Sequence, residues 1–341
     1  MKIFQVITLS ELGGAQSVVL NLANNLANEH EVFVIAGGDG AMWKQLDDRV
    51  KQIKIKSLKR SISPLDFFVW LKLLWLRLKH RPDIVHLHSS KIGILGRLAF
   101  AKKKTVYTVH GFDSIRVAYR KFLPIEKLLK GRAKAIVAVS NYDYNNLISE
   151  NIKKNIFTVY NGISPISVNN TLSKLPVSHD KKTVLTIARL DPPKRYSLFE
   201  EVAKILPQYN FVWIGNKTVP PNPPQNVFCL GEVSNAAQYN PFADLCLLAS
   251  DYEGLPMTII EAMSAGKPVI ASDVGGISEI VRNGENGYCL KNNAELFAEK
   301  IAEILENKNL YEKMAQNSKQ IFEKQLTVEK MVEGYFRIYQ L

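Results

Sequence analysis

The sequence predicts an α/β protein with two doubly wound domains. Its 341 residues are enough for two domains of roughly 100–200 residues each. In both halves, short β-rich runs that end in Gly, Ser or Asn alternate with segments of helical periodicity. A stretch rich in Ser, Asn and Pro separates the halves. Because such alternation implies parallel strands with helices on both faces, each half is expected to be Rossmann-like.

The first half is expected to form a domain over residues 1–162. It opens with a strand at Lys2–Ile7 and a helix at Ala15–His30, in which apolar residues recur every three to four positions. Helical segments then separate further β-rich runs, which are "EVFVIAG", "DIVHLHSS", "KTVYTVHG", "KAIVAVS" and "NIFTVYNG".

The second half repeats this pattern after a linker at 163–181. Its domain is expected over 182–320, and a C-terminal helix at 321–341 is expected to pack back on the first domain. The expected helices are "SLFEEVAKILPQ" and "PMTIIEAMSAG", and the expected strands are "KTVLTIARL", "NFVWIGN", "VFCLGEV", "LCLLAS" and "PVIASD". Ligands bind such sheets at the carboxyl ends of their strands, so a cleft between the domains is the expected site.

Composition narrows the class of protein. Three cysteines, with no C-x-x-C pair, are expected to be buried and reduced, as in a cytoplasmic protein. No signal peptide is expected, and no run approaches the ~20 apolar residues of a membrane-spanning helix.

Positive charge is concentrated in the first half. The whole chain carries a net charge of +12, whereas residues 1–165 hold 26 Lys and Arg against 12 Asp and Glu. Such asymmetry indicates an anionic partner for that half. Two basic and aromatic stretches, "SLKRSISPLDFFVWLKLLWLRLKHR" and "FDSIRVAYRKFLPIEKLLKGRAK", suit an anionic membrane surface. A buried helix pair with solvated lysines is the alternative.

Two glutamates lie eight positions apart in "YEGLPMTIIEAMSAGKP". Pro256 suits the first turn of a helix, so Glu253 precedes the helix and Glu261 lies inside it. The free N–H groups of a helix start can hold a phosphate, and carboxylates accept hydrogen bonds from sugar or ribose hydroxyls. The alternative is that Glu253 caps the helix and Glu261 is solvated.

Cations and glycines follow other strands. In "ARLDPPKR" the strand is expected to end at Arg189 and the next helix to begin at Lys194, so that both cations could neutralise a diphosphate. Gly13 and Gly14 join the first strand to the first helix, where backbone amides can approach a phosphate. Both features could equally be ordinary surface charges and a tight turn.

Histidines end two strands of the first half. His110 follows "KTVYTV", and His86 and His88 share one face of their strand. A lone histidine is more often structural than catalytic. Two histidines without a third ligand are a poor metal site, and no metal site is expected.

Together these motifs resemble retaining glycosyltransferases of family 4, which have the two-Rossmann GT-B fold and act in bacterial polysaccharide and lipid-linked glycan synthesis. The two glutamates match the E-x7-E signature of that family, and "AMSAGKPVIASDVGGISEIVRNGENGYCL" extends the match. The resemblance covers nearly the whole chain. One departure is Gly-Leu-Pro after the first Glu, where many relatives have Phe-Gly.

The resemblance implies a role for each matching residue. Diphosphate binding would fall to Arg189 and Lys194, with the amides of Gly14, Met257 and Thr258. Glu253 would hold hydroxyls of the transferred sugar, Glu261 the nucleotide ribose, and His110 would touch the sugar near the reacting carbon. The wider donor site would also include Gly13, Leu230, Gly254 and Leu255.

The implied activity is transfer of a hexose from a nucleotide diphosphate sugar, with UDP favoured, to a glycan or polyprenyl-diphosphate-linked acceptor. Ser89, Ser90 and Lys91 could lie near the acceptor. No D-x-D motif is present, so neither a metal nor another cofactor is expected. The protein is expected at the inner face of the cell membrane, and nucleic acid is not an expected partner. The alternatives are a nucleotide-sugar epimerase of the same fold, a phosphorylase, and a non-catalytic module that binds an anionic surface or nucleic acid.

Overall fold

The computed structural model describes residues 1–166 and 175–341. Its contacts divide the chain into a first unit, Met1–Ile163 with Val328–Leu341, and a second unit, Ser164–Thr327. The chain thus returns to the first unit at Val328, later than the expected boundary at residue 321. The expected linker lies partly outside the described residues, and its last part is packed, because Leu175 is buried in the core of the second unit.

The first unit is built on one parallel sheet. Within this fully described unit the strand order is β3-β2-β1-β4-β5-β6-β7. The strands are β1 (Lys2–Leu9), β2 (Glu31–Gly37), β3 (Lys51–Lys54), β4 (Ile84–His88), β5 (Thr105–Val109), β6 (Ala135–Ala138) and β7 (Ile156–Thr158). Its helices are α1 (Gly14–Leu26), α2 (Asp66–His80), α3 (Ser90–Ala99), α4 (Leu123–Leu129), α5 (Asn141–Ser149) and α10 (Val328–Gln340).

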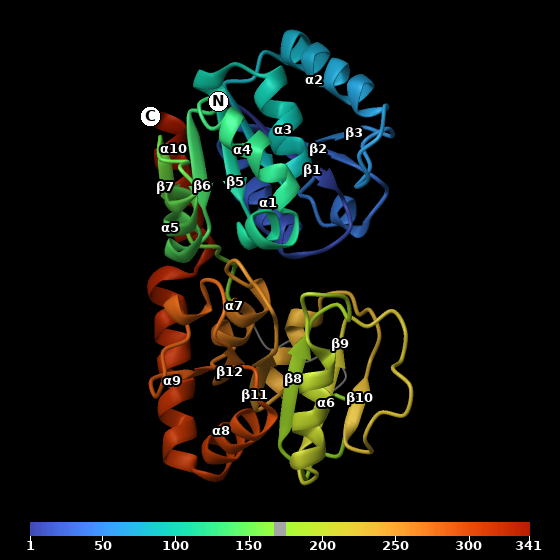
Figure 1. Ribbon diagram of the computed structural model, residues 1–341, viewed down its shortest axis with the longest axis vertical. Coiled ribbons are helices and arrows are strands. Elements are labelled where there is room, and N and C mark those ends of the chain that lie inside the picture. The colour runs from blue at the N-terminus through green and yellow to red at the C-terminus, as the bar shows by residue number, and fades with distance from the viewer. Residues whose placement is uncertain (167–174) are drawn as a thin grey trace. The chain divides into compact units, whose positions relative to one another are not determined.

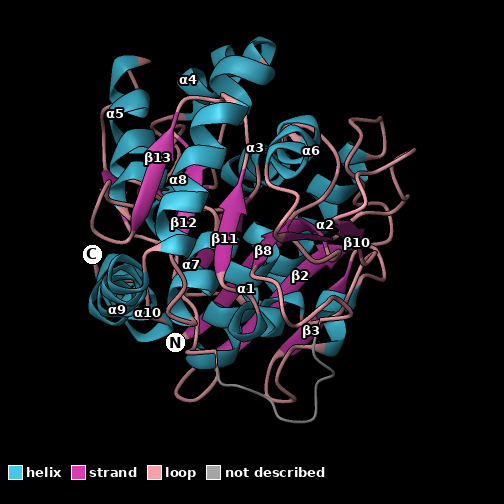
Figure 2. Ribbon diagram, turned by 90° about the horizontal axis from the view of Figure 1, so that it is seen from below, coloured by secondary structure: helices cyan, strands magenta, loops and turns pink. Residues whose placement is uncertain are grey.

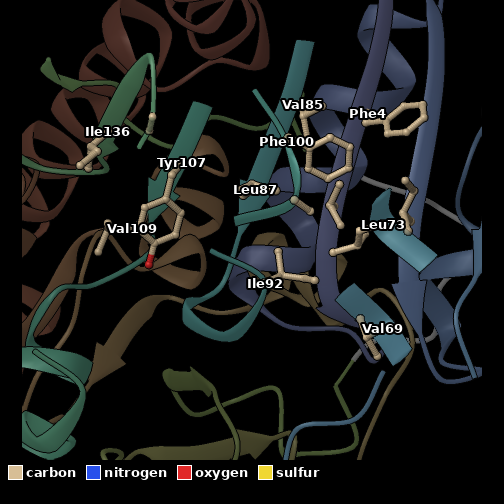
Figure 3. Packing of buried hydrophobic residues seen from close by; sticks show 14 of the residues in the cluster. Phe4, Val69, Leu73, Val85, Leu87, Ile92, Phe100, Tyr107, Val109 and Ile136 are labelled. Atoms are coloured by element: carbon tan, nitrogen blue, oxygen red, sulfur yellow. The ribbon is translucent and has the colours of Figure 1, made fainter. Parts of the chain in front are cut away.

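The central strands of this sheet are buried because apolar side chains cover both faces. Figure 3 shows Phe4, Val85 and Phe100 packed together, with Val69 and Leu73 of α2 in the same cluster. Burying each such side chain contributes about 1.5–3 kcal/mol. The C-terminal helix α10, red in Figure 1, lies beside the green strands of this unit, and Tyr339 on it is buried.

The second unit repeats the architecture. In its described part the strand order is β10-β9-β8-β11-β12-β13. The strands are β8 (Thr183–Ile187), β9 (Asn210–Ile214), β10 (Val227–Cys229), β11 (Leu245–Leu248), β12 (Val269–Ser272) and β13 (Gly287–Leu290). The helices are α6 (Tyr196–Ile205), α7 (Met257–Ser264), α8 (Ala294–Glu306) and α9 (Lys308–Gln325). Figure 2 shows α8 lying across β12 and β13, which it contacts.

Each sheet reverses its strand order at one place. In the first unit the reversal lies between β1 and β4, and in the second between β8 and β11. These topological switch points are where doubly wound sheets bind ligands, outside the carboxyl ends of the strands. Residues that follow β1, β4, β8 and β11 therefore lie where a fold of this kind binds its ligand.

Candidate functional site

The cations predicted to bind a diphosphate follow β8 at the switch point of the second unit. Arg189 is exposed just beyond the end of the strand. Lys194 does not begin a helix, as the sequence suggested, because its backbone forms an antiparallel bridge with Ser250 and α6 starts only at Tyr196. This bridge joins the segment after β8 to the segment after β11.

The bridge brings Lys194 to Glu253, the first glutamate of the E-x7-E pair. The Lys194 ammonium forms an ion pair with Glu253 Oε1, and the Ser250 hydroxyl donates to the same oxygen over 2.6 Å. Both charged side chains are mostly buried, at 18% and 12% exposure, so the pair is weakly screened by solvent. A buried pair of this kind holds the carboxylate in one orientation.

Further contacts that the sequence did not reveal fix Ser250. Its N–H donates to Ser272 Oγ over 2.8 Å, and its carbonyl accepts from Asn292 Nδ2 over 3.0 Å. Ser272 in turn donates to Asn292 Oδ1 over 2.5 Å. Since Ser272 ends β12 and Asn292 follows β13, these contacts depend on the pairing of the strands and could not be predicted from local sequence.

Gly275 allows a second loop to approach Glu253 closely. Its φ is +62°, and a Cβ at this position would lie 2.0 Å from the carbonyl oxygen of Glu253. The next residue, Gly276, donates its N–H to Gly254 over 2.9 Å. The segment Glu253–Gly254 is thus fixed on its backbone side, while Leu255 anchors it in the core at 4% exposure.

The helix that follows, α7, presents its N-terminus beside this cluster. Pro256 is the N-cap, and Met257 and Thr258 supply the first N–H groups, which have no partner within a helix. The Thr258 hydroxyl oxygen is buried and has no hydrogen-bond partner among the residues that the structure describes. Amides, a hydroxyl and the positive end of the helix dipole together suit an anion.

Glu261 lies one turn farther along α7 and is partly buried. Burial raises the pKa of its carboxyl group to about 7 because removal from water disfavours the charged form. A carboxylate in such an environment is stabilised by donated hydrogen bonds, as ribose hydroxyls would supply.

The turn after β10 holds Leu230, which was predicted to lie beside the nucleotide base. Its N–H donates to Trp213 over 2.9 Å, and the next N–H, that of Gly231, donates to Asn216 Oδ1 over 2.9 Å. Gly215 closes the adjacent turn. Its φ is +112°, and a Cβ at this position would collide with the carbonyl of Ala188. The loops that end β8, β9 and β10 are therefore tied together.

The turns at the switch point of the first unit follow β1 and β4. Gly13 is the N-cap of α1 and Gly14 its first residue. Ser89, with a φ of +80°, is the N-cap of α3, and its hydroxyl lies 2.7 Å from Thr8 Oγ1. Thus the end of β4 is tied to the end of β1.

Of the two other residues predicted to lie near the acceptor, Lys91 makes structural contacts. The Lys91 ammonium donates to the carbonyls of Lys59 and Ser61 over 2.8 and 2.7 Å, and pairs with Asp66 at 2.6 Å. Two carbonyl oxygens and a carboxylate thus surround the ammonium group, and these contacts anchor the loop before α2. Ser90 is the first residue of α3.

His110 follows β5 and is joined to His88. The distance between His110 Nε2 and His88 Nδ1 is 3.0 Å, and burial lowers the pKa of His110 to about 4. The imidazole is therefore neutral near pH 7. No group of three or more His, Cys, Asp or Glu among residues 1–166 and 175–341 could hold a metal ion. In the same residues, no helix has the length and apolar composition needed to cross a bilayer.

Family models match both units. The model described as "Glycosyltransferase Family 4" matches residues 12–165, and that described as "Glycosyl transferases group 1" matches residues 168–321. The chain belongs to glycosyltransferase family 4. The expected family is thus confirmed, and the two matches together cover every strand of both described sheets except β1.

Curated relatives and solved structures agree with this assignment. The glycosyltransferase is 29% identical to the O-antigen biosynthesis glycosyltransferase WbnH of Escherichia coli, over 91% of this chain and 92% of that one. It is 27% identical to an E. coli UDP-Gal:alpha-D-GlcNAc-diphosphoundecaprenol alpha-1,3-galactosyltransferase, over 91% and 89%. The structure of Anabaena Alr3699/HepE in complex with UDP-glucose matches with a TM-score of 0.82 and 21% identity, over 100% and 98% of the chains. This likeness confirms the GT-B fold.

Proposed function

We propose that this glycosyltransferase transfers a sugar from a UDP-sugar to a lipid-linked acceptor during assembly of a bacterial cell-surface polysaccharide. The observation that carries the proposal is the cluster at the switch point of the second unit. There Arg189, Lys194 and the N-terminus of α7 supply positive charge, and Glu253 and Glu261 supply acceptors for hydroxyl groups. This is the pattern needed for a nucleoside diphosphate joined to a sugar.

The choice of substrates is supported by the relatives. The name of one E. coli relative specifies UDP-galactose and a diphosphoundecaprenol acceptor, and a structural neighbour was crystallised with UDP-glucose. Both names contain UDP, which makes a UDP-sugar the first donor to test. We place the diphosphate against Arg189, Lys194 and Thr258, the sugar against Glu253 and the ribose against Glu261.

The proposed reaction retains the configuration of the anomeric carbon. The bond from this carbon to the diphosphate oxygen breaks, and the acceptor oxygen bonds to the same face of the sugar. The leaving phosphate takes the proton of the acceptor hydroxyl. Arg189, Lys194 and the start of α7 stabilise negative charge on the leaving diphosphate, the kind of preorganised electrostatic effect that usually contributes most to catalysis. Because these groups carry the charge, we propose that no metal or other cofactor is required.

We propose that the first unit, which would bind the acceptor, contacts the inner face of the cell membrane through α2. Phe67, Phe68 and Leu78 are 58%, 60% and 72% exposed, although Val69 and Leu73 on the opposite face are buried. A helix whose aromatic and aliphatic side chains face outward beside lysines suits the interface of an anionic membrane.

Cations accompany this exposed face. Lys72 and Lys79 place their ammonium groups 3.9 and 4.6 Å from the Trp75 ring. By contrast, three cations of the other basic stretch pair with carboxylates, as Lys127 does with Glu150 at 2.7 Å. The first stretch therefore supports membrane binding better than the second.

Donor binding is tested by thermal shift and calorimetry with UDP-, GDP- and ADP-sugars. A bound ligand raises the melting temperature according to its concentration relative to its Kd. We expect stabilisation by one UDP-sugar, lost in Arg189→Ala and weakened in Glu253→Ala, with Lys324→Ala on α9 as a charge-matched control. If no nucleotide-sugar binds in the presence of vesicles and lipid acceptor, the proposal is wrong.

The reaction is tested with the donor so identified and an undecaprenyl-diphosphate-linked sugar. NMR of the anomeric proton early in the reaction should show retained configuration, and EDTA should leave the rate unchanged. Inverted product would refute the retaining mechanism. Release of UDP with an altered free sugar, without acceptor, would identify an epimerase instead.

Membrane binding is tested by sedimentation with vesicles of phosphatidylglycerol or phosphatidylcholine. The double variant Phe67→Ser/Phe68→Ser should lose binding to the anionic vesicles, whereas the matched change Val219→Ser, at another exposed apolar residue, should not. Equal sedimentation of the double variant and the wild type would exclude α2 as the membrane-binding surface.

A further inference from the structure

A buried chain of polar side chains runs through the first unit at its switch point. It starts at His110, passes through β4 and β1 and ends on α10. Gln5, His86 and His88 are each 0% exposed, so every polar atom in the chain needs a partner within the protein. The proposed reaction assigns no role to these residues, and the family resemblance implies a role for His110 alone, as a contact to the donor sugar.

The hydrogen bonds on the His110 side have a defined direction. His88 Nε2 lies 2.8 Å from Gln5 Oε1, and an amide oxygen only accepts, so His88 Nε2 carries the proton. A neutral imidazole has one N–H, which leaves a lone pair on His88 Nδ1. His110 Nε2, 3.0 Å away, must therefore donate to it.

The far side of the chain continues in the same direction. Gln5 Nε2 donates to the Tyr339 hydroxyl over 3.1 Å, and that hydroxyl lies 2.7 Å from His86 Nδ1. His86 Nε2 is 2.6 Å from Thr108 Oγ1, which donates to the Tyr335 hydroxyl over 3.1 Å. If the oxygen and nitrogen of the Gln5 amide exchanged places, every hydrogen bond in the chain would have to reverse its donor and acceptor.

This direction of the hydrogen bonds requires neutral imidazole rings, which burial favours. Burial lowers the pKa values of His86 and His88 well below the ordinary value for histidine, and that of His110 to about 4. With its proton on Nε2, His110 has a lone pair on Nδ1. That atom is buried, and among the described residues it has no hydrogen-bond partner.

We propose that His88 is a positioning residue that, oriented by Gln5, holds His110 in the Nε2-protonated form, so that His110 Nδ1 accepts a hydrogen bond from a hydroxyl of the donor sugar. The inference deepens the proposed function and rests on it for the identity of the sugar. It predicts that His110 accepts a hydrogen bond from a hydroxyl group and does not act as an acid.

The protonation pattern is measured first in the wild-type protein without ligand. Long-range ¹H–¹⁵N NMR of ¹⁵N-histidine-labelled protein distinguishes protonated from bare ring nitrogens, and the chain has only six histidines to assign. We expect a proton on Nε2 and none on Nδ1 for both His88 and His110 at pH 7. A proton on His110 Nδ1, or a doubly protonated ring, would overturn the inference.

The ligand-dependent part uses the same signals. UDP-glucose, UDP-galactose and UDP-N-acetylglucosamine are added in turn, with UDP alone as the control. The ¹⁵N resonance of His110 Nδ1 should move with a UDP-sugar that calorimetry shows to bind, and should stay in place with UDP. Measured binding without this movement refutes the inference. If no nucleotide-sugar binds at all, the proposed function fails, whereas the NMR result without ligand still decides the protonation of His110.

Variants separate positioning from packing. His88→Leu removes the acceptor for His110, whereas His88→Asn keeps an oxygen near the position of Nδ1. We expect His88→Leu to lower kcat/KM about three- to tenfold, the loss typical of one hydrogen bond, with the Kd for UDP unchanged. His88→Asn should recover most of the loss and the His110 signal. Equal activity in both variants, or equal loss, would overturn the role of His88; should His88→Leu fail to fold, the wild-type NMR still decides.

Discussion

Neutralising Glu261 should make this glycosyltransferase more stable while weakening its donor binding. A pKa raised from 4.5 to about 7 means that the folded second unit holds a proton more tightly than the unfolded chain does. The contribution of Glu261 to stability is therefore most favourable below pH 4.5 and is lost as pH rises through about 7. At about 1.4 kcal/mol per pKa unit, the ionised carboxylate costs up to roughly 3 kcal/mol above pH 7.

Glu261→Gln removes this penalty. The variant should be more stable than the wild type by up to roughly 3 kcal/mol at pH 8, with a difference near zero at pH 4.5. The same change removes a charged acceptor for ribose hydroxyls, so the Kd for UDP should rise about tenfold. Stability gained where function is lost is typical of a binding site.

The assay follows the second unit alone. Trp213 is the one tryptophan of the four in the chain that lies between residues 164 and 327, and it is fully buried. Urea unfolding of 5-fluorotryptophan-labelled protein, followed by ¹⁹F NMR at pH 5–8, therefore reports that unit. The control is Glu323→Gln, at an exposed residue of α9. A Glu261→Gln difference that stays constant or shrinks as pH rises would refute the reasoning.

Three further predictions follow from other contacts. UDP-sugar binding should release a proton from Glu261 near pH 6–7, so calorimetry in two buffers of different ionisation enthalpy should give different enthalpies; identical values would contradict the pKa. Gly275→Ala should destabilise the second unit by more than about 2 kcal/mol, because residue 275 has a positive φ and the added Cβ would lie 2.0 Å from a carbonyl oxygen. Gly284→Ala, with a φ of +76° and open space around it, should cost only about 1 kcal/mol by urea unfolding; equal losses would show that the close approach is unimportant. Arg97→Met should destabilise the first unit by about 3–5 kcal/mol, since it leaves the buried Glu126 carboxylate without its partner 2.6 Å away. The double variant Arg97→Met/Glu126→Leu should recover most of that stability in urea unfolding, and a double variant as unstable as the single one would contradict this account.

Much of the fold could be predicted from sequence because strands and helices are marked by local periodicity. The expected β-rich runs all contain strands, with ends that move by a few residues. Two strands gave no signal. β3, "KQIK", lies at the edge of its sheet and is mostly exposed, and β13, "GYCL", is short and begins with glycine. Their pairing with neighbouring strands forms them, rather than their composition.

The C-terminal boundary shows the same limit. One helix was expected from residue 321, but α9 ends at Gln325 and α10 begins at Val328. Both helices have apolar faces at helical spacing, so periodicity alone does not separate them. What separates them is the surface against which each packs, since α9 lies in the second unit and α10 in the first.

The candidate site was predictable in part. Strand ends and the E-x7-E spacing indicated Arg189, Lys194, Glu253 and Glu261 as candidates, and their roles remain predictions. Lys91 was proposed near the acceptor because it follows a strand, yet its contacts anchor a loop. A position after a strand does not tell whether a cation is already neutralised by its neighbours.

By itself, then, the sequence determined which residue types follow which strands, because turns and periodicity depend on near neighbours. The family signature added the class of reaction. Tertiary structure alone decided which of those residues interact and in what protonation state. Burial raises the pKa of Glu261, and the order at Glu253 depends on Ser272 and Asn292. The orientation of the buried histidines depends on a hydrogen bond between Gln5 and Tyr339, whose side chains are 334 residues apart. Protonation and hydrogen-bond direction depend on burial and on partners distant in sequence, so neither can be predicted from a local sequence pattern.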